Sequence, residues 1–171
     1  MEVQLHTFLL ADIAGYSRFA ERSGDEAAAE VAIHFAEQVS RLAQDHGTDF
    51  VKAIGDAVIV HGLDAGATLE LALTLADGGP DRPRELPRVH AGMHTGPALS
   101  RAGDWWGTTL NITARVAAAA RAGQLLVTEA ARRAAGEPGS RRLRELGALD
   151  LKNISAPVRV YAPFPGAYGL A

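Results

Sequence analysis

The stretch LHTFLLADIAGYS, residues 5–17, decides how the rest of this sequence is interpreted. The apolar residues Phe8 to Ala11 predict a strand that enters a hydrophobic core, and we place that strand at residues 3–11. An acid, Asp12, follows at once, and Gly15 then breaks the pattern. A carboxylate at the end of a buried strand has two explanations. Either it caps the next helix, or the turn is built around a group that needs negative charge.

Helical and strand patterns alternate along the rest of the chain. Ser23 and Glu26 form a capping-box pattern ahead of an amphipathic helix that Gly47 closes. The apolar face of this helix recurs at three- and four-residue spacing and consists of Ala28, Val31, Ala32, Phe35, Val39 and Leu42. The other predicted elements are a hairpin over 48–62 that turns at Gly55–Asp56, helices over 64–76, 109–122 and 129–135, strands over 88–96 and 124–128, a loop over 77–87, and a last edge strand after Pro157.

The element order predicts an α+β fold: a ferredoxin-like βαββαβ core with additional C-terminal α/β elements. The length suits one domain over residues 1–171, with a core at about 3–161 and a short C-terminal tail. In this topology the first strand lies in the centre of the sheet beside the hairpin. We therefore expect Asp12 and Asp56 to lie at the same end of the sheet.

Composition limits the kinds of partner. A net charge of −3 gives no reason to expect nucleic acid, and the absence of cysteine excludes disulfides and thiolate metal sites. The N-terminus lacks the basic and apolar regions of a signal peptide, and the longest apolar tract is too short and polar to span a bilayer. The expectation is a cytoplasmic protein with no membrane partner.

Two carboxylates brought together would repel each other unless cations lie between them. Two Mg²⁺ ions would remove the repulsion, and paired metals serve in-line phosphoryl displacement. The alternative is that Asp12 is a helix cap and Asp56 a turn residue. Lys52 lies on a strand of otherwise apolar residues and requires a hydrogen-bond acceptor there, which favours the metal-binding interpretation. The glycine turn IAGYS would add backbone N–H groups suited to a phosphate.

A second group of polar residues lies in RAGDWWGTTLNITARVAAAARAG, residues 101–123. Asn111 and Arg115 are four residues apart and share one face of the predicted helix. Such a pair is often only a solvated surface.

Five segments, in order, resemble the motifs of class III nucleotidyl cyclases, the family of adenylyl and guanylyl cyclases. They are FLLADIAGYSRFAE, VKAIGDAVIVHG, VHAGMHTG, DWWGTTLNITARVAAAARAGQLLVTE and LKNISAPVRVYAP, and the match runs from about Val3 to Tyr161. The sequence departs from the family motifs at a position that contacts phosphate in some members and in the length of a hairpin. Pro97 stands where some members keep an arginine, and the stretch from Gly96 to Asp104 is short, which implies a trimmed hairpin.

The resemblance implies a role for each matching residue. Asp12 and Asp56 would hold two Mg²⁺ or Mn²⁺ ions, with the Ile13 carbonyl as an additional ligand. The amides of Ile13, Ala14, Gly15, Tyr16 and Ser17 would cradle the triphosphate, and Lys152 would add a phosphate contact. Lys52 and Asp104 would recognise adenine. Asn111 would orient the ribose, and Arg115 would stabilise charge on the transferring phosphoryl group. His94 is then structural.

The function implied is an adenylyl cyclase that forms 3′,5′-cyclic AMP from ATP by two-metal catalysis. Because one chain holds both halves of the family's shared site, the resemblance implies a head-to-tail homodimer, with Trp105 and Trp106 as interface anchors unless one fills the core. The alternatives are a cyclase of GTP or a pyrimidine nucleotide and a non-catalytic nucleotide-binding dimer. An RNA-binding ferredoxin-like domain would show a basic face and strand aromatics, which this sequence lacks.

Overall fold

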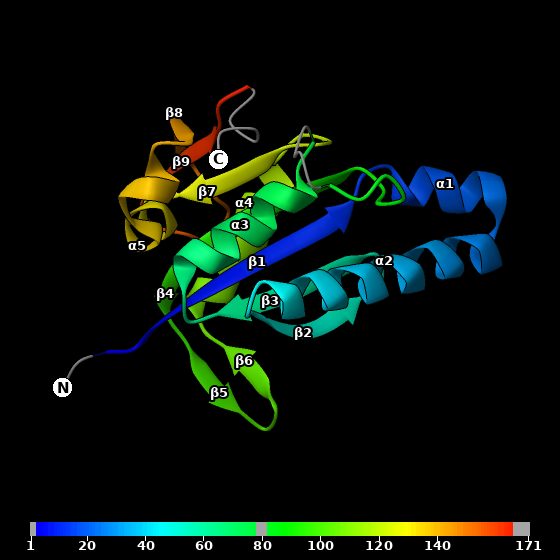
Figure 1. Ribbon diagram of the computed structural model, residues 1–171, viewed down its shortest axis with the longest axis horizontal. Helices are drawn as coiled ribbons and strands as arrows, with labels where there is room; N and C mark the ends of the chain where they lie inside the picture. The colour runs from blue at the N-terminus through cyan, green and yellow to red at the C-terminus, as the bar shows by residue number, and fades with distance from the viewer. Residues whose placement is uncertain (1–2, 78–81, 166–171) are drawn as a thin grey trace.

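A seven-stranded sheet in the order β2-β3-β1-β4-β7-β9-β8 forms the centre of the computed structural model, which describes residues 3–77 and 82–165 (Figure 1). A separate two-stranded sheet pairs β5 with β6. The elements in chain order are β1 (Leu5–Ile13), α1 (Tyr16–Ser23), α2 (Asp25–Asp45), β2 (Asp49–Ile54), β3 (Ala57–Gly62), α3 (Ala65–Leu75), β4 (Val89–Pro97), β5 (Leu99–Arg101), β6 (Asp104–Trp106), α4 (Thr108–Ala119), β7 (Leu125–Thr128), α5 (Glu129–Ser140), β8 (Leu143–Leu149) and β9 (Val158–Pro163).

β1 lies between β3 and β4 and is antiparallel to both, as the predicted topology requires. Successive side chains of a strand point to opposite faces of the sheet. Leu9, Ala11 and Ile13 therefore join the main hydrophobic core on one face, while Phe8 and Leu10 line a pocket on the other. This alternation leaves Asp12 on the pocket face, at the end of the strand.

Helices cover both faces of the sheet. α2, α3 and α5 pack on the face that holds the main core, and Figure 1 shows α2 and α3 in front of the central strands. α4 packs against β4, β1 and β7 on the opposite face. Gly92 of β4 permits this close approach, because a Cβ atom there would lie 2.3 Å from the backbone nitrogen of Ala117. The sheet thus fixes the helix that carries Asn111 and Arg115.

The prediction of an α+β fold is confirmed, and so is the hairpin that turns at Gly55–Asp56. The predicted capping box is wrong. Ser23 is the last residue of α1, and Gly24, with φ of 87°, separates α1 from α2. This backbone conformation suits glycine and interrupts a helix. The predicted apolar face of α2 is nevertheless correct, since Ala28, Phe35 and Val39 are buried.

The C-terminal part differs from the prediction in its strand order. β8 was not predicted, and it forms the edge of the sheet, so β9 lies inside, between β7 and β8. The predicted end of the helix over 129–135 corresponds to a break in α5 at Gly136, with φ of 77°. α4 ends at Ala119, three residues earlier than expected. The predicted 77–87 loop and the C-terminal tail fall partly on 78–81 and 166–171, outside the described residues.

Candidate active site

The first cluster of polar residues lies where β1 ends beside the β2–β3 turn. Asp12 pairs in register with Ala57, and the backbone N–H of Ile13 donates to the carbonyl of Asp56 at 3.2 Å. Asp12 and Asp56 line a cavity of about 520 Å³ together with His90 and the first residues of α1. We call this cavity the acid pocket. Two aspartates 44 positions apart by residue number thus meet at one end of the sheet, as the topology predicted.

The electrostatics of Asp12 fit a divalent cation. Its Oδ1 atom is buried and has no hydrogen-bond partner among the described residues. Burial, then the hydrogen bond and the negative charge of Asp56, raise the pKa of Asp12 to about 6. Within residues 3–77 and 82–165, no three His, Asp or Glu side chains form a ready metal cage. Two carboxylates are a suitable protein donor set for Mg²⁺ or Mn²⁺, since Mg²⁺ keeps several waters and substrate phosphates as ligands.

His90 of β4 also belongs to the acid pocket, and sequence reasoning missed it. Its Nδ1 lies 3.0 Å from the carbonyl of Ala117, and its Nε2 lies 3.7 Å from Oδ2 of Asp12. The carbonyl can only accept, so Nδ1 donates to it and Nε2 faces the carboxylate. The sequence signal for His90 was its place in the segment VHAGMHTG, whose strand is next to the strand of Asp12 in the predicted sheet.

The glycine turn starts a helix, as expected, but not all of its amides are free for a phosphate. Gly15 has φ of 71° and precedes α1. The Ile13 amide donates to Asp56, and the Ala14 amide donates to the carbonyl of Arg88 at 2.9 Å. The amide cradle expected over Ile13–Ser17 therefore narrows to Gly15, Tyr16 and Ser17, whose N–H groups have no acceptor within α1.

Lys52 and Asp104 come together on the pocket face of the sheet. The ammonium of Lys52 on β2 forms an ion pair with Oδ2 of Asp104 on β6. Asp104 Oδ1 accepts a hydrogen bond of 2.8 Å from the backbone N–H of Trp105. The hydrogen bonds from Lys52 and Trp105 lower the pKa of Asp104, which keeps it ionised as an acceptor. The pair lines a cavity of about 700 Å³, which we call the base pocket after the role that the family resemblance implies for Lys52 and Asp104.

α4 connects the base pocket to a third cavity. Asn111 lines the base pocket and also a neighbouring cavity of about 300 Å³ that contains Arg115 and Lys152. We call the latter the arginine pocket. Asn153, which follows Lys152, adopts φ of 63° and bends the β8–β9 connection. The predicted residues thus fall into two groups. Lys52, Asp104, Asn111, Arg115 and Lys152 line adjoining pockets, whereas none of them lines the acid pocket.

The two tryptophans have different environments. Trp106 is 57% exposed. Trp105 packs against His6 and His61, two buried histidines that sequence reasoning did not single out. His94 is buried, and its Nδ1 lies 2.7 Å from the hydroxyl of Thr128. Burial lowers the pKa of His94 to about 4, so the ring is neutral near pH 7.

Comparison with known proteins identifies relatives over most of the chain. The model of the adenylate and guanylate cyclase catalytic domain matches residues 2–161. The chain is 34% identical over 167 residues to a pH-sensitive adenylate cyclase of Mycobacterium tuberculosis, covering 94% of this chain and 41% of that protein. It is 31% identical over 120 residues to an adenylate cyclase of Streptomyces coelicolor, covering 70% of this chain and 31% of that protein. The chain thus spans less than half of these relatives.

Solved structures of cyclases are also similar to this chain. A cyclase structure from Silicibacter pomeroyi, described as an adenylate/guanylate cyclase/hydrolase, has a TM-score of 0.78 and 28% identity, covering 96% of this chain and 98% of that one. An adenylate cyclase of Trypanosoma brucei has a TM-score of 0.80 at 21% identity, covering 97% and 91%. At this identity the Trypanosoma brucei structure shows that the two chains share a fold. Among the described residues, no helix is long and apolar enough to cross a membrane. The chain belongs to the adenylate and guanylate cyclase catalytic domain family, the class III nucleotidyl cyclases.

Proposed function

We propose that this chain converts ATP to 3′,5′-cyclic AMP and pyrophosphate at the interface of a head-to-tail homodimer. The observation that carries this proposal is the ion pair of Lys52 with Asp104 in a pocket that shares Asn111 with the arginine pocket. The adenylate cyclases among the relatives support the choice of ATP.

The chemistry of the pair suits adenine. The ammonium of Lys52 donates to the ring nitrogen N1, and the carboxylate of Asp104 accepts from the 6-amino group. Guanine presents a donor at N1 and an acceptor at position 6, so it would place like against like at both contacts. Asp104 is the group that rejects guanine most strongly, because a carboxylate facing O6 leaves two acceptors without a proton between them.

The reaction forms a bond between the ribose 3′ oxygen and the α-phosphorus, breaks the bond from that phosphorus to the bridging oxygen, and releases pyrophosphate and the 3′-hydroxyl proton. Asp12 and Asp56 would hold divalent cations, which would supply the Lewis acidity that makes the 3′-hydroxyl more acidic and neutralises phosphate charge. Asn111 orients the ribose for attack. Arg115 donates to the equatorial α-phosphoryl oxygens as their charge increases, and Lys152 neutralises the leaving phosphates. The amides of Gly15 to Ser17 hold the triphosphate.

Two features support assembly across a dimer. Among the residues that the structure describes, the acid pocket shares no lining residue with the base or arginine pockets. The two groups would meet when a second copy brings its acids to this chain's base pocket. Large apolar side chains near the base pocket are also exposed: Ile54 by 56%, Leu99 by 53% and Trp106 by 57%. An exposed apolar patch of this kind is typical of an interaction surface.

The test supplies ATP, GTP, CTP and UTP separately to the purified protein with Mn²⁺ or Mg²⁺ and identifies the product by mass. We expect cyclic AMP, and none from Asp56→Ala, which removes one acid of the pair. Activity per chain should rise with protein concentration, because dissociation separates the two groups of residues. A different cyclic nucleotide would overturn the assignment of ATP. Metal-dependent nucleotide binding without any cyclic product would identify a binding module instead.

A further inference from the structure

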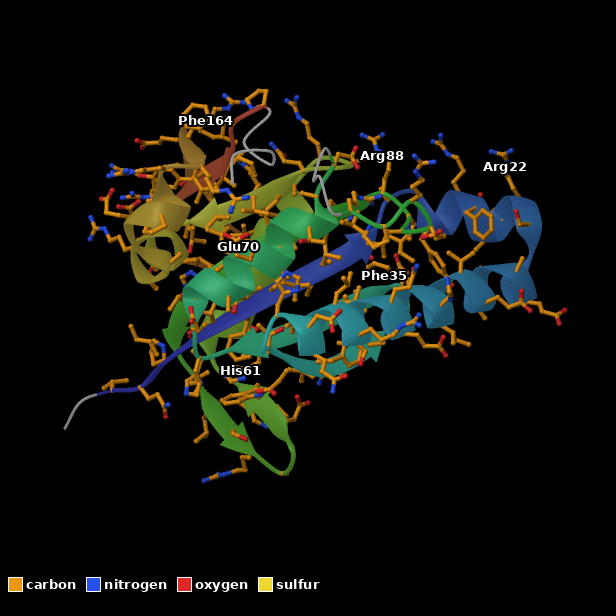
Figure 2. All side chains as sticks on the ribbon, in the orientation of Figure 1. Arg22, Phe35, His61, Glu70, Arg88 and Phe164 are labelled. Carbon is orange, nitrogen blue, oxygen red and sulfur yellow. The ribbon has the colours of Figure 1, made fainter. Side chains whose placement is uncertain are left out.

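Three rings from distant parts of the chain pack together beside the base pocket: two buried histidines and a half-buried tryptophan that lines the pocket. They are His6 of β1, His61 of β3 and Trp105 of β6, which we call the His–Trp stack. The rings of His61 and Trp105 are stacked, with centroids 4.4 Å apart and planes inclined by 25°, and His6 lies 4.7 Å from Trp105. Both histidines are buried, with 8% and 5% of their surface exposed. Figure 2 shows His61 at the root of the β5–β6 hairpin.

Hydrogen bonds fix the proton positions of the two histidines. His61 Nδ1 lies 3.3 Å from a carboxylate oxygen of Asp49, and His61 Nε2 lies 2.9 Å from His6 Nδ1. The carboxylate accepts, so Nδ1 of a neutral His61 carries the proton and its Nε2 accepts from His6. Burial and the neighbouring His61 lower the pKa of His6, which favours its neutral form. Each facing nitrogen therefore has a partner, and both rings are held in one orientation.

The hairpin that carries Asp104 depends on this stack. β5 and β6 contain three residues each, and within the described part of the chain they pair only with one another, so no ladder there joins them to the seven-stranded sheet. A two-stranded hairpin of this size is not stable by itself in water. Besides the ion pair of Asp104 with Lys52, Trp105 supplies the hairpin's aromatic contact with the sheet, through the two histidines and the edge of Phe8, whose ring centroid lies 5.5 Å from that of Trp105.

The position of the β5–β6 hairpin affects the base pocket through one residue, Asp104. The backbone N–H of Trp105 donates to Asp104 Oδ1, and the other oxygen of Asp104 binds Lys52. Asp104 and Trp105 both line the base pocket. If loss of the ring contacts shifts the backbone of Trp105, the carboxylate of Asp104 is expected to shift with it.

We propose that His6 and His61 are positioning residues for base recognition, which hold Trp105, and through it Asp104, in the orientation that distinguishes adenine from guanine. This inference rests on the proposed role of Asp104. The base lies away from the reacting phosphorus, so loss of the stack weakens binding and selectivity more than the chemical step. Aromatic pairs contribute about 0.5–1.5 kcal/mol beyond the area that they bury, which corresponds to roughly a 3- to 10-fold change in affinity.

The first experiment needs no catalysis. The chain has two tryptophans, so Trp106→Phe leaves Trp105 as the only indole reporter. In that background His61→Leu removes a stacked ring and a hydrogen-bond partner. We expect red-shifted Trp105 emission and stronger quenching by acrylamide. Val39→Ala, in the core on the opposite face of the sheet, is the matched control for general destabilisation and should leave the emission unchanged. Unchanged Trp105 emission in His61→Leu would overturn the inference.

The second experiment measures KM and kcat for ATP and GTP in a wild-type tryptophan background. For His61→Leu we expect KM for ATP to rise about 3- to 10-fold, a kcat within about 2-fold of wild type, and a smaller preference for ATP over GTP. His6→Asn, whose side-chain amide can still donate to His61, should retain most of the preference. Equal preference in wild type and His61→Leu, with both proteins folded, would contradict the inference.

The two proposals fail in different ways. If wild type forms no cyclic product, the proposed function fails, and the preference is then read from equilibrium binding of ATP and GTP by calorimetry. A binding preference that His61→Leu reduces and Val39→Ala does not would still support the positioning role. A preference that both variants retain would reject it.

Discussion

Lys52 on β2 and Asp104 on β6 form an ion pair in the base pocket although they are 52 positions apart in the chain. The side chains are 38% and 32% exposed, so a base that enters the pocket can reach both. Each charge satisfies the other in the absence of a ligand. The pair is therefore accessible and charged, as the proposed recognition of adenine requires.

Removal of one member should weaken catalysis with ATP. We expect Lys52→Ala to lower kcat/KM for ATP about 10- to 100-fold, since a hydrogen bond from a charged group contributes about 1.5–3 kcal/mol. Steady-state rates with ATP and GTP provide the measurement, and Arg41→Ala, an exposed change on α2, is the control. An unchanged kcat/KM for ATP would contradict base recognition by Lys52.

Reversal of the hydrogen-bonding pattern should reverse the base preference. In Lys52→Glu combined with Asp104→Ser, the new carboxylate accepts from N1–H and the 2-amino group of guanine, and the serine hydroxyl donates to O6. We expect the ratio of kcat/KM for GTP to that for ATP to rise by at least about 10-fold, measured by competition between the two nucleotides. A double variant that keeps the wild-type ratio would place base selection elsewhere.

Mixing of two inactive variants tests whether the site is shared between chains. Asp56→Ala lacks an acid in the acid pocket, and Arg115→Ala lacks the guanidinium of the arginine pocket. Each should be at least about 100-fold less active alone. In an equimolar mixture half of the dimers are mixed, and each has one intact site of two, so about a quarter of wild-type activity should return. Complementation that is absent, despite exchange of subunits shown by native mass spectrometry, would argue against the shared site.

The ionised carboxylate of Asp12 should make the metal-free protein less stable than a variant without that charge. Its pKa is raised from 3.8 to about 6 in the folded state, mainly by burial and then by Asp56. The folded state therefore holds the proton more tightly than the unfolded state, and ionisation costs stability as pH rises from 3.8 through 6, with the full cost above 6. In EDTA, Asp12→Asn should melt above wild type at pH 7.5 and close to it at pH 3.5.

Divalent cations should reverse that order. Mn²⁺ at pH 7.5 should raise the melting temperature of wild type and leave that of Asp12→Asn unchanged, because the variant lacks a charged ligand. Asp150→Asn, at an exposed position, is the control and should respond as wild type does. Equal Mn²⁺ stabilisation of Asp12→Asn and wild type would remove Asp12 from the metal site.

Glu129 should stabilise the junction of β7 and α5. It accepts from Arg132 at 2.9 and 3.0 Å and from Arg133 at 2.7 Å. Hydrogen bonds from Arg132 and Tyr161 lower the pKa of Glu129 to about 2. Glu129→Gln should cost about 1–3 kcal/mol at pH 7. The contribution is complete above pH 4.5 and is lost as pH falls through 2, so urea denaturation should show a smaller difference at pH 3 than at pH 7.

The control for this comparison is Glu30→Gln, at an exposed position of α2. Its unfolding free energy should match that of wild type within about 0.5 kcal/mol at both pH values. A Glu129→Gln deficit of the same size at pH 3 and pH 7 would mean that the charge of Glu129 contributes nothing beyond packing.

Local patterns in the sequence predicted most of the core. The apolar run Phe8–Ala11 and the hairpin around Gly55–Asp56 are strands of the sheet, because alternation and turn chemistry act between neighbouring residues. The same local reasoning failed at Ser23, where two helices meet at Gly24, and at β8, whose mixed sequence is stabilised by its place beside β9. Such boundaries depend on contacts between elements, which no local pattern contains.

The sequence by itself determined which residues to expect at the site, because its motifs resemble those of the cyclase family: Asp12, Lys52, Asp56, Asp104, Asn111 and Arg115. Only the tertiary structure decided how they are grouped. It brings Lys52 to Asp104 and separates both from the acid pocket. It also places His6, His61 and His90 beside these groups. A histidine carries no local signal of its partner, because its role depends on burial and on hydrogen bonds to residues that are distant in the chain.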